Sequence, residues 1–457
     1  MHPTVWTLND NNQPITLQAQ KLTLFQQCKI IECTASNDLN YLLFFYKDQF
    51  LTVQPLVKFD GASFLGQVKQ FGSHIQTPNP LFSKLLSPTT TISVTPITQL
   101  LRKIKINFTI EESVLIFSYF DSYLTVLELE NLLKDCFFTH RRDGKILGAY
   151  RLAEILFSRG YKQNWLLSTS QHPDYSSASK HFQAPLSSLL ASDPIYVEQT
   201  CFLDLENHYD LLLHLYKQQN RHLDLMIISI TNWLKQPKAL NYPNLIQTLS
   251  TYLNEDELLQ CLQSLLPTVS PKSSLHQDVY QRLITKQDFK AAVDLLLAYS
   301  IQLSEKETLK LPDLFEKVSL STLNLPIDVT SKRLFRLFKH HPIHLEKILL
   351  TELPLLLKEQ SLTQLQTWLQ EIPYSQELPI VQKINEMVKL KENPDCQLEL
   401  GTHYFDLQQY EQAIECFCWD MELNPNRTEP VQWLAKTYFK LGKHEEGESY
   451  QQLLKHK

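Results

Sequence analysis

The sequence predicts an α+β protein, in which a small N-terminal β-containing domain is followed by an all-α helical-repeat solenoid. Apolar residues alternate with polar ones in parts of residues 1–110, which is the period of half-buried strands. After Glu111 the apolar period becomes helical and remains so. Glycine is scarce, with 9 residues in 457 and none between Gly160 and Gly401. The middle of the chain therefore offers no glycine-rich ligand loop.

Composition and charge narrow the class of protein. Hydrophobic residues make up 43% and charged residues 20% of the chain, which is typical of a folded protein rather than a disordered one. The N-terminus has no signal-peptide pattern, and the longest apolar runs are far shorter than the roughly 20 residues of a membrane span. Eight cysteines are too few for a disulfide scaffold. We therefore expect a cytoplasmic protein with no membrane association.

Strand patterns predict a β-rich domain over residues 1–110. Polar and apolar residues alternate from Ile15 to Gln20 and again from Ile104 to Ile110. Two apolar runs, Tyr41–Tyr46 and Phe50–Val57, are separated by three polar residues. This arrangement predicts a β-hairpin.

A helical hairpin is predicted over residues 111–167. Thr125, followed three residues later by Glu128, matches a capping box at the start of a helix. The next helix carries the small residues Ala149 and Ala153 on one face, which would allow close packing of the two helices.

A Ser-rich stretch over residues 168–195 is predicted as a connector, because few apolar periodic positions survive in it. Residues 196–392 are predicted as an α-helical repeat region, in which antiparallel helices stack to bury apolar faces that one pair cannot bury alone. Helix start signals recur along and just after this region: Ser304 with Glu307, Ser361 with Gln364, and Asn393 before Pro394.

The C-terminal segment 393–457 carries small and aromatic residues at regular spacing. Gly401 and Ala413 are small where the two helices of a hairpin would press together, and Pro425 would end the second helix. This spacing resembles the tetratricopeptide repeat family. The positions that carry the resemblance are Leu400, Gly401, Tyr404, Tyr410, Ala413, Phe417 and Pro425.

A second, more degenerate repeat follows 34 residues later. Leu434, Ala435 and Tyr438 hold the corresponding places, whereas Gly447 and Gln451 stand where the family has alanine and phenylalanine. We interpret this repeat as the polar cap that ends a solenoid. The first repeat also departs from the family pattern, at Gln397 and Asp420.

The resemblance implies a peptide-binding scaffold, since such repeats typically carry no chemistry and hold a partner against their first helices. The family's carboxylate clamp uses Lys and Asn where this chain has Leu398 and Thr402, so binding of chaperone C-terminal tails is not implied. Alternatively, the two repeats only close the solenoid. The partner-binding groove positions carried over from the family are Asp395, Leu398, Thr402, Phe405, Asp406, Glu429, Gln432, Lys436, Phe439 and Lys440.

The N-terminal domain supplies weaker candidates for ligand binding. Gly61 and Gly66 have the glycine spacing of a phosphate loop, but Gln67 and Val68 follow where Lys and Ser or Thr are needed, so a turn between strands is expected. Residues 77–98 are rich in Pro, Ser and Thr, which predicts an exposed loop or lid.

No catalytic residue, metal or cofactor is predicted. A histidine group near Pro342 is interpreted as a helix junction, since the proline interrupts the helical spacing that shared metal ligation would need. A second group lies in the Ser-rich stretch without the sequence context of a nucleophile. The groups weighed are His340, His341, His344 and Glu346, and His172, His181 and Asp174.

Arg141 and Arg142 lie in the densest positive cluster and are weak candidates for anion binding. The interpretation that we favour is that they are cations at a helix C-terminus, where they suit the helix dipole. The formal net charge of the whole chain is −6, so nucleic-acid binding is not expected.

The sequence thus favours a cytoplasmic scaffold or adaptor, not an enzyme, that binds a protein or peptide through a tetratricopeptide-like solenoid. The alternative is a ligand-binding or enzymatic N-terminal domain that the helical repeats regulate. The partner and the oligomeric state are not defined by the sequence.

Overall fold

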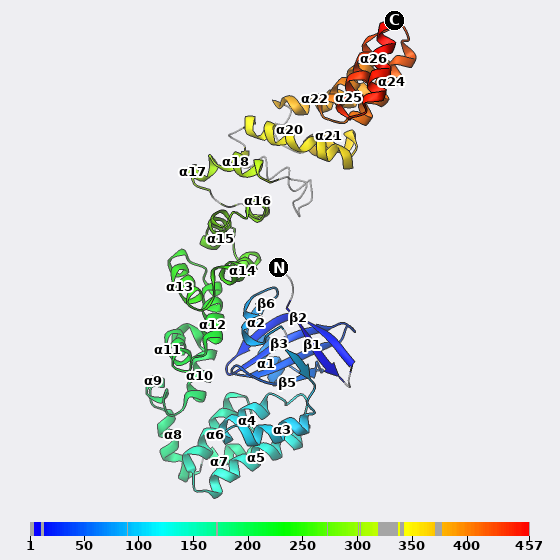
Figure 1. Cartoon of the computed structure of the whole chain (residues 1–457). Helices are drawn as coiled ribbons and strands as arrows, with labels where there is room; N and C mark the ends of the chain where they lie inside the picture. Colours follow the sequence, from blue (N-terminus) through cyan, green and yellow to red (C-terminus); the bar gives the residue numbers. More distant parts are fainter. Residues whose placement is uncertain are drawn as a thin grey trace. The chain divides into compact units, whose positions relative to one another are not determined.

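The computed structural model confirms the α+β class, with a sheet at the N-terminal end followed by helices (Figure 1). The chain divides into two compact units, Met1–Leu275 and His276–Lys457, which are described separately. The structure describes residues 4–10, 13–88, 90–170, 172–271, 273–299, 301, 303–318, 337–338, 342–370 and 377–456.

The sheet has the strand order β5-β4-β3-β2-β1-β7, and β6 pairs with β2. The long strand β2 can serve two neighbours on one side, because its first half pairs with β1 and its second half with β6. Its pairing with β3 shifts register between Ala19 and Lys21, which is a local irregularity of the bulge type. The strands are β1 Val5–Asp10, β2 Gln13–Phe25, β3 Cys28–Ala35, β4 Asn40–Tyr46, β5 Gln49–Pro55, β6 Ser73–Gln76 and β7 Thr91–Ser93.

The predicted hairpin is confirmed as β4 and β5, with Lys47 at a positive φ of 52° in the turn. The predicted strand over residues 104–110 is wrong. These residues lie in two helices, α3 (Ile97–Asn107) and α4 (Ile110–Ser118). Every second residue is apolar there, yet only the helical spacing from Leu100 to Ile104 is buried, whereas Ile106 is 81% exposed.

The region between the hairpin and α3 is more regular than expected. The prediction of a turn between strands at Gly61 is wrong, because the segment leads from β5 into helix α1 (Phe64–Phe71), which contains Gly66. The predicted loop or lid at residues 77–98 contains helix α2 (Leu81–Leu85) and strand β7. Both short elements pair or pack with the rest of the N-terminal unit, since β7 pairs with β1 and α2 contacts a later helix.

The helical hairpin predicted after α4 is confirmed as α5 (Val126–Arg142) and α6 (Ile146–Ser158). Thr125 and Glu128 form the predicted capping box. Gly144 lies between the two helices at a φ of +69°, a conformation that favours glycine.

The Ser-rich stretch predicted as a connector is helical. Two of its helices pack on α6 and the third contacts the helix that follows it, while the buried carboxylate of Asp193 pairs with Arg151 of α6. The short helices of this stretch were not predicted, because their apolar faces span only one or two turns. They are α7 (Asn164–Ser170), α8 (Ser176–Phe182) and α9 (Leu186–Leu189).

The first unit continues through longer helices that pack consecutively, as predicted for an α-helical region. Helix α12 contacts both β6 and α2, so these helices and the sheet belong to one unit. The helices are α10 (Pro194–Leu203), α11 (Leu205–Gln218), α12 (His222–Lys235), α13 (Tyr242–Tyr252) and α14 (Glu255–Leu265).

The second unit is helical throughout its described residues. Ser304 and Ser361 both form the predicted capping contacts, with Glu307 and Gln364. The helices are α15 (Ser274–Thr285), α16 (Phe289–Ala298), α17 (Glu305–Thr308), α18 (Leu311–Glu316), α20 (Pro342–Glu359), α21 (Leu362–Gln370), α22 (Pro379–Lys391), α23 (Gln397–Asp406), α24 (Tyr410–Leu423), α25 (Glu429–Lys440) and α26 (His444–His456). Among the described helices, none has both the length and the apolar character needed to cross a membrane.

The helical assignment of residues 97–107 can be tested by a matched pair of substitutions. We expect Ile104→Ala to lower the free energy of unfolding by about 2–4 kcal/mol, because Ile104 is buried. Ile106→Ala should change it by less than about 0.5 kcal/mol, because Ile106 is exposed. Urea unfolding measures both values. In a strand the two residues would share one face, so equal effects would contradict the helix.

Candidate functional site

Within each of the two C-terminal hairpins, α23–α24 and α25–α26, a glycine allows the two helices to pack closely. A Cβ atom at Gly401 would lie 2.5 Å from the ring of Phe417 on the facing helix. Ala413 is fully buried in the same interface. Glycine at 401 therefore sets the distance between α23 and α24.

The second hairpin uses glycine for the same purpose. A Cβ atom at Gly447 would lie 2.9 Å from the ring of Phe439. The departure from alanine at this position thus keeps a small residue where α25 and α26 pack. Because Gly447 packs against the ring of Phe439, one side of this predicted groove residue is covered within its own hairpin. Phe439 is therefore less free to contact a partner.

All ten residues predicted to line a partner-binding groove are exposed or half-buried, and none is buried. By contrast Leu400, Tyr404 and Leu434, on the same helices, are buried. The helical period therefore separates a packed side from an accessible side. We call the accessible side of α23 and α25 the hairpin face. It comprises Leu398, Thr402, Phe405, Asp406, Glu429, Gln432, Lys436 and Lys440.

Phe405 and Lys436 of the hairpin face form an aromatic cluster with Trp433 of α25. The ring centroids of Phe405 and Trp433 lie 5.2 Å apart, tilted by 66°. The ammonium of Lys436 lies 4.9 Å and 4.3 Å from these two centroids, which is within cation–π range. Phe405 and Lys436 were predicted, whereas Trp433 was not, since it stacks on the buried ring of Phe417 as well.

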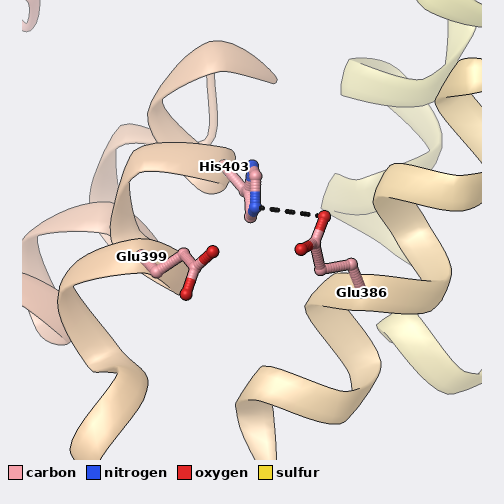
Figure 2. A group of neighbouring side chains, drawn as sticks. All are labelled: Glu386, Glu399 and His403. Carbon is pink, nitrogen blue, oxygen red and sulfur yellow. Dashed lines mark ion pairs between the residues drawn. The ribbon is translucent and has the colours of Figure 1, made fainter.

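Helix α23, the first helix of the hairpin face, is also joined by polar contacts to α22, the helix before it. Lys383 of α22 forms an ion pair with the predicted residue Asp406, with an Nζ–Oδ2 distance of 2.7 Å. One further group joins the same two helices, and Figure 2 shows its side chains, Glu386, Glu399 and His403. Sequence spacing indicated neither contact, because both depend on how α22 packs on α23.

The other predicted anion site does not assemble in the structure. Arg142 donates to the carbonyl of Phe138 and to the hydroxyl of Thr139, both at 3.3 Å and both on its own helix. Arg151, which the sequence places near this cluster, is instead paired with Asp193. These contacts favour the interpretation of Arg141 and Arg142 as cations at the C-terminus of α5.

The glycine motif near residue 61 serves the start of α1. The carboxylate of Asp60 accepts hydrogen bonds from the backbone N–H groups of Ala62 and Ser63, at 2.9 Å and 2.7 Å. Asp121 accepts the N–H of Phe64 at 2.7 Å. The amides that would hold a phosphate therefore already bind carboxylates of the protein.

The two histidines of the Ser-rich stretch, His172 and His181, contact different carboxylates. Nε2 of His181 lies 2.7 Å from the buried carboxylate of Asp193, whereas His172 pairs with Asp174 at the surface. Next to Asp193 the structure has a cavity of about 310 Å³. His340 and His341 lie outside the described residues.

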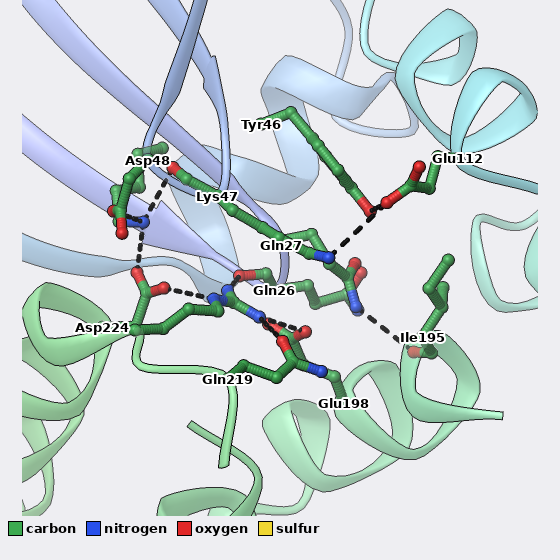
Figure 3. Close-up of polar contacts among 12 residues, drawn as sticks. Gln26, Gln27, Tyr46, Lys47, Asp48, Glu112, Ile195, Glu198, Gln219 and Asp224 are labelled. Carbon is green, nitrogen blue, oxygen red and sulfur yellow. Dashed lines mark hydrogen bonds and ion pairs between the residues drawn. The ribbon is translucent and has the colours of Figure 1, made fainter. Parts of the chain in front are cut away.

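A buried ionic cluster in the first unit is the largest feature that sequence reasoning missed (Figure 3). Lys29 of β3 lies 2.6 Å from Asp224 of α12, and both side chains are fully buried. Arg221 contacts Asp224 at 2.6 Å and Glu198 of α10 at 2.5 Å. The cluster thus binds the sheet to two helices, whose residues Glu198 and Asp224 follow Lys29 by 169 and 195 residues.

The charges of this cluster stabilise one another. Burial alone would raise the pKa of Asp224, but the adjacent cations Arg221 and Lys29 outweigh burial, so the pKa lies below its ordinary value. Burial alone would lower the pKa of Arg221, but Asp224 and Glu198 raise it well above its ordinary value. Asp224 and Arg221 therefore remain charged at neutral pH, and their pairing has a structural function.

We compared the chain with known protein families and with curated protein sequences, and it matches none of them. The resemblance to tetratricopeptide repeats therefore depends on the spaced residues of 393–457 alone. The geometry of the hairpin face has to be interpreted from its own chemistry.

The ionic cluster provides a matched test of buried and exposed ion pairs on one cation. Asp224→Asn should destabilise β3 and α12 by about 3–5 kcal/mol, because Lys29 and Arg221 stay buried with a neutral partner. Asp48→Asn, at the half-exposed second partner of Lys29, should cost less than about 1 kcal/mol. Hydrogen exchange of peptides from β3 and α12 measures both effects.

The pH dependence of stability follows from the lowered pKa of Asp224. The stability that its charged carboxylate contributes is fully present above the pKa of the unfolded chain, near 3.8, and is lost as the pH falls through the lower pKa of the folded protein. Protection of β3 should therefore fall more steeply below pH 4 in the parent protein than in the Asp224→Asn variant. Parallel curves would contradict the assignment.

Proposed function

We propose that the protein is a scaffold that binds a protein or peptide partner through the hairpin face, as tetratricopeptide-like repeats do. The observation that carries this proposal is the aromatic cluster of Phe405, Trp433 and Lys436, held on two hairpins of fixed spacing. Aromatic side chains and cations on a rigid surface are typical of binding hot spots. In this role the hairpins hold a partner and carry out no reaction.

The chemistry of the hairpin face favours a particular class of peptide. Lys436 and Lys440 are exposed one turn apart on α25, where they would attract acidic side chains. The rings of Phe405 and Trp433 offer apolar surface next to them. The partner we propose is an extended segment with one apolar or aromatic side chain followed by an acidic residue.

The first helix contributes a neutral surface rather than a carboxylate clamp. Leu398 and Thr402 are half-buried, and the hydroxyl of Thr402 donates to the carbonyl of Glu399 at 2.7 Å. This supports recognition of an internal acidic segment by α25, in place of a terminal carboxylate held by α23.

The cytoplasm is the compartment we propose for this interaction. All eight cysteines are free, and six of them are buried. Burial raises the pKa of the Cys28 and Cys261 thiols to about 12, so neither ionises at neutral pH. Unpaired thiols of this kind are typical of a reducing compartment.

Peptide selection tests the proposal without knowledge of the natural partner. A phage-displayed library of random peptides panned on the full chain should enrich an apolar residue next to acidic ones. Phe405→Ala and Lys436→Met should each weaken binding of the enriched peptide by at least about tenfold, as measured by fluorescence polarisation.

The matched control is Trp419→Ala, which removes an aromatic side chain that is 54% exposed on α24, outside the hairpin face. Binding should be unchanged in this variant. Failure to enrich any peptide, or equal affinity in all three variants, would contradict the proposal.

A second candidate function rests on the cavity beside Asp193 in the first unit. Its volume of about 310 Å³ is at the lower end of small-molecule sites, and Lys47, Arg151 and Asp193 contribute to its lining. A thermal-shift screen of the full chain against charged metabolites should then find a stabilising ligand. Ile195→Trp, which narrows the cavity, should abolish that shift. A shift that persists in this variant would place the ligand elsewhere.

A further inference from the structure

Two helices of the second unit bring one histidine and two glutamates together. Glu399 and His403 lie four residues apart on α23, and therefore on the same side of the helix. Glu386 reaches them from α22. Their potential ligand atoms all lie within 4.8 Å of one another. Figure 2 shows the two carboxylates on either side of the imidazole.

The imidazole nitrogen in this group has no hydrogen bond. Nε2 of His403 is shielded from solvent and lies 3.8 Å from the nearest carboxylate oxygen of Glu386. At this distance the two groups form an ion pair but no hydrogen bond. A buried nitrogen normally has a hydrogen bond, and an ion placed between the three side chains would give Nε2 a direct ligand bond instead.

We propose that Glu386, Glu399 and His403 form a site for a divalent transition metal of the zinc class. One imidazole nitrogen and two carboxylate oxygens are a ligand set that zinc accepts, with water completing a tetrahedral site. Calcium and magnesium prefer oxygen ligands alone, so the imidazole selects against them.

The site can close by rotation of side chains alone. Ligand atoms about 2.0–2.2 Å from zinc lie roughly 3–3.6 Å apart in a tetrahedron, which is closer than the present 4.8 Å limit. The side chain of Glu386 is 55% exposed and Glu399 is exposed, so both carboxylates can move toward the nitrogen. His403 is only 18% exposed and stays in place as the fixed ligand.

A bound ion would join α22 to α23 at a second point. The ion pair between Lys383 and Asp406 already spans these helices. Metal would add a stronger link and fix the orientation of α23. The metal site itself does not depend on the proposed peptide binding, although both use α23.

Calorimetric titration of the chelator-treated full chain with zinc chloride tests the site. We expect one saturable site. His403→Gln, Glu399→Gln and Glu386→Gln should each weaken zinc binding by at least about tenfold. His444→Gln, at an exposed histidine of α26, should bind zinc as the parent does. Calcium and magnesium should not compete. Circular dichroism establishes that each variant is folded.

Cobalt supplies a second readout, since tetrahedral cobalt with a nitrogen ligand absorbs in the visible range. This absorption should appear in the parent and be lost in His403→Gln. Undiminished zinc binding in His403→Gln would overturn the proposal, as would the absence of saturable binding. Loss of binding in Cys396→Ser with normal binding in Glu386→Gln would place the ion on a thiol and would overturn it as well.

Discussion

The ion pair between Lys29 and Asp224 is the contact on which the first unit depends. Both groups are fully buried, and a charge in such a place is tolerated only if it is paired. Arg221 and Glu198 complete the cluster, so removing any single member leaves an unbalanced charge inside the protein. The N-terminal sheet is therefore joined energetically to α10 and α12, which lie in the same compact unit.

This long-range link lies outside what sequence patterns can predict. Lys29 is a single polar residue between Cys28 and Ile30 in a strand, and nothing local distinguishes a buried lysine from an exposed one. Its partner follows almost 200 residues later. The same limit applies at residues 104–110, where alternation favoured a strand. Their burial follows from helix packing, in which Ile104 is covered and Ile106 is exposed.

The C-terminal hairpins were predicted more fully because their determinants are local. Gly401 and Ala413 stand at a spacing that only a tight helix pair requires, and the structure places Gly401 against Phe417. The same period leaves Phe405 half-buried and Lys436 exposed, away from the packed side of their helices. Trp433 was missed because it belongs to the packed side and the accessible side at once.

Helix α23 shows how one short helix can take three roles. Gly401 packs on α24, Phe405 belongs to the hairpin face, and His403 lies toward Glu386 of α22. Exposure decides which of these contacts can respond to a ligand. The buried cluster around Lys29 has no freedom to rearrange, whereas the exposed carboxylates around His403 can turn toward an ion. Side chains capable of ligation therefore indicate a binding site only where some of them are accessible and one of them lacks a hydrogen bond.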